Sequence, residues 1–172
     1  MPTALSFTQK VFFASEKLKA FVTSLNSEFN KRRHKSLTFT IGAPGVAGCD
    51  FNFASAANTT AQPIDLGTII PAFAQISSVI AKTDVAFSGT GITAFGVTGG
   101  TTSGGTELFA SADLIAKDAI NQPAVGAGYT LIAVSKDAKK IYIGGAPTGG
   151  NWSALTAGKI SVFVNYMDNV NA

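Results

Sequence analysis

The pattern of apolar residues changes near residue 35, and this change restricts the fold more than any other feature. Beyond it, apolar residues occur in short or alternating runs separated by Gly, Pro, Asn and Asp. Runs of this kind predict β-strands joined by turns. The predicted strands are Leu37–Ile41, Asp50–Phe53, Ile64–Ile70, Ala74–Phe87, Ile92–Val97, Glu107–Leu114, Thr130–Ser135, Lys140–Ile143 and Lys159–Met167.

Many short strands with frequent turns favour a mainly β fold, an antiparallel β-sandwich that is jelly-roll-like in its winding. In the last predicted strand, Ile160, Val162, Val164 and Tyr166 alternate with Ser161, Phe163 and Asn165, so that either set could face the core. The glycine pairs Gly144-Gly145 and Gly149-Gly150 are predicted to be turns.

The N-terminal segment follows a different period. Between Ser6 and about Lys35 the apolar residues recur every three or four residues, which predicts one amphipathic α-helix. We therefore divide the chain into a helix with a basic end, residues 1–35, and a β-sandwich domain, residues 36–172. The apolar stripe could pack on its own domain, on copies of itself or in the groove of a partner. Its width favours a partner, and the predicted interface residues are Phe12, Phe13, Leu18, Phe21 and Leu25.

Basic residues are concentrated near the end of this predicted helix. Residues 7–35 carry seven basic and two acidic residues, a net charge of +5, whereas the rest of the chain carries six lysines and eight acids, a net charge of −2. The asymmetry indicates a basic arm on a nearly neutral body. An acidic protein surface or nucleic acid could bind there, but no aromatic residues interleave to stack bases, so nucleic acid is the less favoured partner. The basic patch is Lys31, Arg32, Arg33 and Lys35.

The sequence contains no motif for catalysis, a cofactor or a metal. His34 and Cys49 are the only histidine and cysteine, too few for a metal site or for a Cys–His pair with its orienting group. The Gly-rich segments lack the Gly-Lys-Ser/Thr ending of a phosphate-binding loop. We therefore predict a protein that is not an enzyme and uses no cofactor. Trp152 is the one candidate exposed aromatic residue, although a core position beside a loop is the favoured interpretation.

Composition and the N-terminal sequence set expectations for location. A single cysteine and a start without the features of a signal peptide predict synthesis in a reducing cytoplasm. No apolar run reaches about 18 residues, so no membrane partner is expected. Only 13% of the residues are charged, which suits a surface partly covered by neighbouring proteins.

Two segments resemble small virion proteins of tailed bacteriophages. They are "IIPAFAQISSVIAKTDVAFSGTGITAFGV", residues 69–97, and "LTAGKISVFVNYMD", residues 155–168. In the first, Thr83–Phe87 is similar to a recurrent "TTAF"-like turn, and in the second Thr156–Tyr166 is similar to a closing "TAGxxxVxVxY" strand. The resemblance covers roughly residues 64–168 and implies a β-sandwich module that binds the particle through protein–protein contacts.

The resemblance further implies a structural protein of the virion, made in the host cytoplasm. Head decoration is the first expectation, and a tail, neck or fibre component that binds a receptor or carbohydrate is the alternative. The expected partners are the major capsid protein or a tail or neck protein, together with copies of this chain in a homo-oligomer such as a trimer. The helix would fix the module to the shell or to its own trimer mates, and the closing strand could pair across a subunit boundary.

Overall fold

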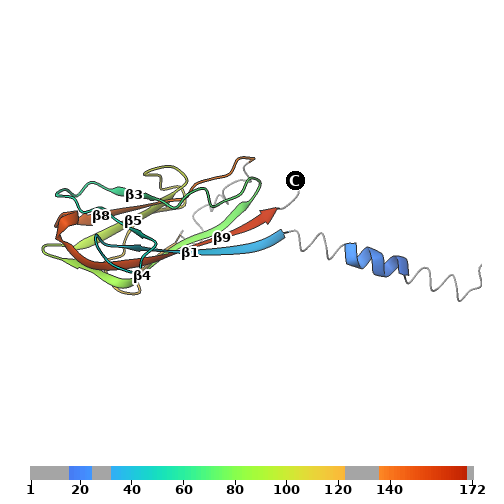
Figure 1. The fold of residues 1–172 in the computed structure, drawn as a ribbon, viewed down its shortest axis with the longest axis horizontal. Coiled ribbons are helices and arrows are strands. Elements are labelled where there is room, and N and C mark those ends of the chain that lie inside the picture. The colour runs from blue at the N-terminus through green and yellow to red at the C-terminus, as the bar shows by residue number, and fades with distance from the viewer. Residues whose placement is uncertain (1–15, 25–31, 123–135, 170–172) are drawn as a thin grey trace, which may run out of the picture.

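The fold is a sandwich of two β-sheets, with a short helix lying apart from them at one end (Figure 1). The computed structural model describes residues 16–24, 32–122 and 136–169, and residues 16–24 are helical. One sheet contains β1 (Arg32–Gly42), β2 (Phe51–Asn52), β4 (Gln75–Gly89), β7 (Ile120–Asn121) and β9 (Leu155–Asn169). The other contains β3 (Gln62–Asp65), β5 (Ala94–Gly100), β6 (Phe109–Asp113) and β8 (Tyr142–Thr148), and a short 3-10 helix, η1 (Trp152–Ala154), precedes β9.

The strand order is that of a jelly roll. The sheets run β2-β1-β9-β4-β7 and β3-β8-β5-β6. The antiparallel partners are nested along the chain: β1 pairs with β9, β3 with β8, β4 with β7 and β5 with β6. A long antiparallel ribbon wound into two facing sheets produces this nesting, and β2 is added parallel to β1. The prediction of a jelly-roll-like β-sandwich is therefore confirmed.

The last strand, β9, occupies the centre of its sheet. Ile160, Val162 and Val164 are fully buried, which shows that the apolar set of alternating residues faces the core. β9 pairs with β1 on one side and with β4 on the other. Because both edges of β9 are occupied within its own chain, the expectation that this strand pairs across a subunit boundary is wrong.

The boundary between helix and sandwich differs from the prediction. The predicted helix extends to about Lys35, but β1 begins at Arg32, before the predicted start of the sandwich domain at Ser36. Arg32, Arg33 and Lys35 are therefore the first residues of a strand and do not form the basic end of a helix. The register of β1 with β9 runs without interruption from Arg32 to Gly42, and such tertiary pairing outweighs local helix propensity.

Two predicted strands have different limits for reasons visible in the backbone. β3 ends at Asp65, earlier than predicted, because Asp65 Oδ1 accepts the N–H of Gly67 at 2.8 Å and Gly67 turns the chain with φ +89°. β8 continues through Gly144 and Gly145, so the turn predicted there is wrong. A Cβ at Gly145 would lie 2.5 Å from the ring of Phe53, so glycine is needed for close packing. The strand predicted at 130–135 lies outside the described residues.

Aromatic rings and buried polar groups join the two sheets. Phe87 of β4 and Phe95 of β5 stack at 3.8 Å between ring centroids, and Phe95 also meets Phe53 edge to face. The buried Asn121 of β7 donates from Nδ2 to the carbonyl oxygens of Val97 and Ala110, at 2.9 and 2.8 Å. Since these bonds satisfy the amide inside an apolar core, they fix β7 against the opposite sheet.

Candidate functional site

The helix exposes an apolar face. Every residue from 16 to 24 is exposed, and Leu18 and Phe21 retain 63% and 60% of their accessible surface. Val22 completes the face, since residues three and four positions apart lie on one side of a helix. Of the predicted interface residues, Leu18 and Phe21 are thus placed on an open surface, whereas Phe12, Phe13 and Leu25 lie outside the described residues.

The basic patch is distributed along the start of β1. Arg32, Arg33 and Lys35 belong to this strand, and Lys31 lies outside the described residues. His34 and Lys35 are both exposed, and as neighbours in a strand they point to opposite faces of the sheet. The basic run therefore belongs to a strand edge, not to one face of a helix end.

The outer side of β1 is closed only at its far end. Asp50 accepts hydrogen bonds from the N–H and the hydroxyl of Thr40, both at 2.8 Å, and the N–H of Asp50 donates to the carbonyl oxygen of Thr40 at 3.0 Å. These hydrogen bonds lower the pKa of Asp50. Sequence analysis missed these hydrogen bonds because Thr40 and Asp50 belong to different segments and no motif marks the pair.

The structure does not bring His34 and Cys49 together. Cys49 Sγ lies against Gly42, at one end of β1, and His34 lies near the other end. At a strand rise of about 3.3 Å per residue, His34 and Gly42 are about 25 Å apart. Among the described residues, no group of three or more His, Cys, Asp or Glu side chains is placed to hold a metal ion.

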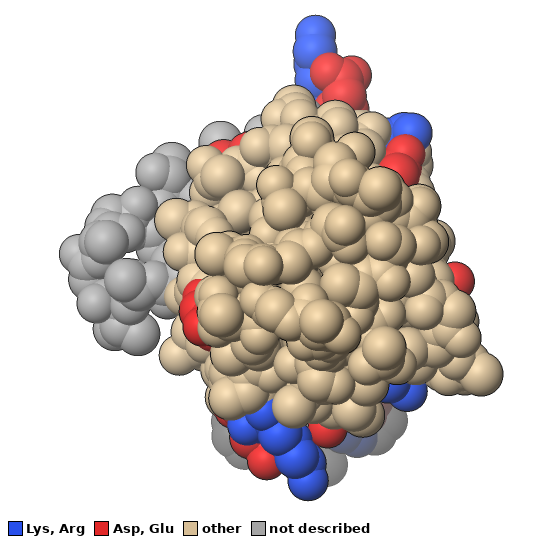
Figure 2. Space-filling model, turned by 90° about the vertical axis from the view of Figure 1, so that its left-hand side faces the viewer, with Lys and Arg blue, Asp and Glu red and all other residues tan. Residues whose placement is uncertain are grey.

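The end of the sandwich opposite the helix presents a mainly uncharged surface (Figure 2). Strand directions bring together here the loops that precede β3, β5 and β9. They belong to segments 51–64, 85–106 and 141–158, none of which contains a charged residue. This end offers Ser, Thr, Asn and backbone groups to solvent.

Trp152 lies beneath this uncharged end and is completely buried. Its ring centroid is 4.8 Å from that of Phe53 and 5.7 Å from that of Phe95, and its indole N–H donates to the carbonyl oxygen of Thr60 at 2.8 Å. The candidate assignment of an exposed aromatic residue is therefore wrong, and the favoured interpretation of a core position beside a loop is confirmed. Trp152 joins two loops, and its ring is not available at the surface to stack against a ligand.

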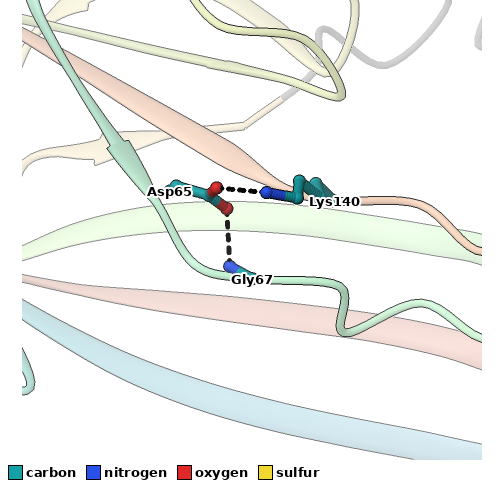
Figure 3. A network of polar contacts seen from close by, with 3 residues as sticks. All are labelled: Asp65, Gly67 and Lys140. Atoms are coloured by element: carbon teal, nitrogen blue, oxygen red, sulfur yellow. Dashed lines mark hydrogen bonds and ion pairs between the residues drawn. The ribbon is translucent and has the colours of Figure 1, made fainter.

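A polar network near the other end of the sandwich joins β3 to Lys140, two positions before β8 begins (Figure 3). Asp65 forms an ion pair with Lys140 at 2.7 Å and also accepts the N–H of Gly67. The hydrogen bond from Lys140, followed by that from Gly67, lowers the pKa of Asp65, and the same carboxylate raises the pKa of Lys140. The network fixes the strand ends.

We expect the stability of the sandwich to fall in acid. The pKa values of Asp50, Asp65 and Asp118 are lower in the folded chain than their usual 3.8. Each carboxylate therefore stabilises the fold above its unfolded pKa, and this contribution is lost as the pH falls through the folded pKa. Thermal unfolding followed by circular dichroism should show a melting temperature that declines below about pH 4.

The variant Asp65→Asn tests the cause of this decline. It should have a shallower dependence of melting temperature on pH, because the neutral amide has no proton to gain in this range. If the profiles of the variant and the wild type are parallel, Asp65 contributes nothing to the acid sensitivity.

No family model matches this chain, and neither the search of curated proteins nor that of solved structures found a match. The class of the protein is therefore defined by its own structure, a jelly-roll β-sandwich with an exposed N-terminal helix. No helix within residues 16–24, 32–122 and 136–169 is long and apolar enough to cross a membrane.

Proposed function

We propose that this chain is a non-enzymatic structural protein of a bacteriophage particle. Its first role is capsid decoration, as an auxiliary head protein that acts through protein–protein contacts. The exposed apolar face of the helix, with Leu18, Phe21 and Val22, carries the proposal, because its side chains are exposed and lie outside the hydrophobic core of the sandwich. A face of this kind is stabilised when a partner covers it.

The fold is consistent with the proposed function but does not distinguish it from other functions. Jelly rolls occur in viral capsid domains, but also in lectins and other proteins, so that the fold alone does not define a function. The segments that resemble phage virion proteins include β4, β5 and β9, which lie inside the two sheets. The partners we propose are the major capsid protein and copies of this chain, in a homo-oligomer such as a trimer, located in the virion.

The uncharged end favours a second candidate function. It lies at the opposite end of the sandwich from the helix, as a recognition surface would in a tail, neck or fibre component anchored by its N-terminus (Figure 1). Burial of Trp152 removes the candidate exposed aromatic residue, so a sugar or receptor would have to be recognised through hydroxyl, amide and backbone groups. Head decoration therefore remains the first candidate.

Sedimentation of particles tests the proposed function. Phage particles from a lysate containing the full chain should retain it through a density gradient, after treatment with nuclease and at high salt. Retention is expected because apolar contacts are not screened by salt, whereas contacts between phosphates and the basic run are weakened. Release of the chain by nuclease would support nucleic-acid binding, and its absence from all particle fractions would contradict the proposal.

A further inference from the structure

The outer edge of β1 is unpaired over part of its length. β9 covers one edge of this strand from Arg32 to Gly42, whereas β2 covers the other edge only at Ile41 and Gly42. The N–H and C=O groups of Thr40 point outward, since both bond to Asp50. In an antiparallel pair these directions alternate, so the same groups of Thr38, Ser36 and His34 also point outward. No described residue hydrogen-bonds to them.

Two other strand edges are protected in ways that this edge is not. β3, at the edge of its sheet, contains Pro63, which has no N–H to donate. β4 has several irregularities in its register, and residues 115–119 hydrogen-bond to its outer edge at Thr83 and Phe87. β1 contains no proline, and its register with β9 has no shift. A regular open edge is a template for a further strand.

We propose that the edge of β1 from His34 to Thr38 binds an extended acidic segment of a partner protein by strand addition. The outward groups of His34, Ser36 and Thr38 supply the hydrogen-bond ladder, and Asp50 ends the ladder at Thr40. This interaction surface is separate from the helix face. It goes beyond the proposed function and does not depend on it, because the partner is defined only by its chemistry.

The positive charge of β1 favours an acidic partner strand at this edge. Basic residues at positions 32, 33 and 35 lie along the strand, and the described residues of β1 contain no acid. Lys35 is exposed within the proposed edge, and a partner strand with a carboxylate opposite it would form a cross-strand pair of opposite charge, which is stabilising. A second copy of β1, paired antiparallel about Ser36, would place Lys35 of one chain diagonally opposite Lys35 of the other and would offer no carboxylate to either. Nucleic acid cannot provide the peptide ladder.

Hydrogen exchange of the full isotope-labelled chain tests the proposal residue by residue. The probe is a peptide about ten residues long in which glutamate and valine alternate, and the control peptide has lysine in place of glutamate. The amides of His34, Ser36 and Thr38 should exchange rapidly in the free protein and at least about tenfold more slowly with the glutamate peptide. Leu37 and Phe39, whose amides bond to β9, should change little. Unchanged exchange at the three outward amides would overturn the proposal.

Ser36→Pro with its matched control Ser36→Ala isolates the backbone contact. Proline removes the outward N–H of residue 36 without removing a bond to β9, whereas alanine keeps that N–H. We expect the proline variant to bind the glutamate peptide at least about tenfold more weakly, and the alanine variant to bind within about twofold of the wild type. Equal binding by both variants would contradict strand addition.

A charge-reversed variant keeps the test valid if proline disturbs folding. Arg33→Glu with Lys35→Glu should reverse the preference and bind the lysine peptide more tightly than the glutamate peptide. Protection of the same amides at high protein concentration without peptide would mean that a second copy occupies the edge. Tighter binding of a single-stranded oligonucleotide, unaffected by Ser36→Pro, would mean a phosphate site. Either result would overturn the proposal.

Discussion

Replacing Leu18 and Phe21 by aspartate should abolish incorporation into particles and self-association while the sandwich remains folded. Both side chains are more than half exposed and lie outside the hydrophobic core. Two carboxylates on the apolar face would have to be desolvated on binding, and loss of two central apolar contacts costs about 4 kcal/mol or more, about a thousandfold in affinity.

The matched control for this prediction lies on the same helix. Ala20→Asp with Thr23→Asp makes the same change of charge at the same spacing on the opposite, polar side, where every residue is also exposed. Circular dichroism should show that both double variants melt near the wild-type temperature. Sedimentation velocity and blots of particle fractions should show that only the Leu18 and Phe21 variant loses self-association and incorporation. If the Leu18 and Phe21 variant unfolds outright, or if both variants are incorporated equally, the helix is not the docking element.

Trp152→Ala should destabilise the sandwich more than any other single truncation that we consider. The side chain is fully buried between Phe53 and Phe95, and its N–H satisfies the carbonyl oxygen of Thr60. Truncating a buried Trp costs about 3–5 kcal/mol, a large part of the total of about 5–15 kcal/mol expected for a domain. The variant should remain folded in water only if the free energy of unfolding of the wild type exceeds this loss.

Denaturant unfolding measures this loss, followed by far-ultraviolet circular dichroism because Trp152 is the only tryptophan. Trp152→Phe should lose less, about 1–3 kcal/mol, since it keeps an aromatic ring but leaves the Thr60 carbonyl without its donor. The control Ile120→Ala removes apolar atoms from a side chain that is 56% exposed and should cost less than about 1 kcal/mol. A Trp152→Ala variant as stable as this control would contradict the role of Trp152 in joining the loops.

The sequence predicts the fold class because local patterns reflect burial. In β9, the alternation from Ile160 to Tyr166 predicts a strand, and the structure buries the apolar set. The Gly144-Gly145 pair in β8 could not be recognised as strand, since the side chain of Thr98 leaves no room for a Cβ at the first glycine and the ring of Phe53 leaves none at the second, and both are distant in sequence. Local pattern thus predicts strands whose side chains alternate, and it fails where packing by distant residues decides the backbone.

The candidate site is predictable to a smaller extent. The period of the N-terminal segment predicts a helix, and Leu18 and Phe21 lie on its exposed face. Trp152 stands in the polar context Gly-Gly-Asn-Trp-Ser, typical of a surface loop, and only contacts with distant segments bury it. The open edge of β1 is likewise invisible in the sequence, because it depends on which strands lie beside β1.

Immunogold electron microscopy of particles, with antibody against the purified protein, tests the central proposal most directly. Capsid decoration predicts label spread over the head of particles from a lysate in which the chain is expressed. Label at one vertex or along the tail would contradict decoration and support the tail, neck or fibre alternative. Unlabelled particles, with the protein left in the soluble fraction, would contradict a role in the virion altogether.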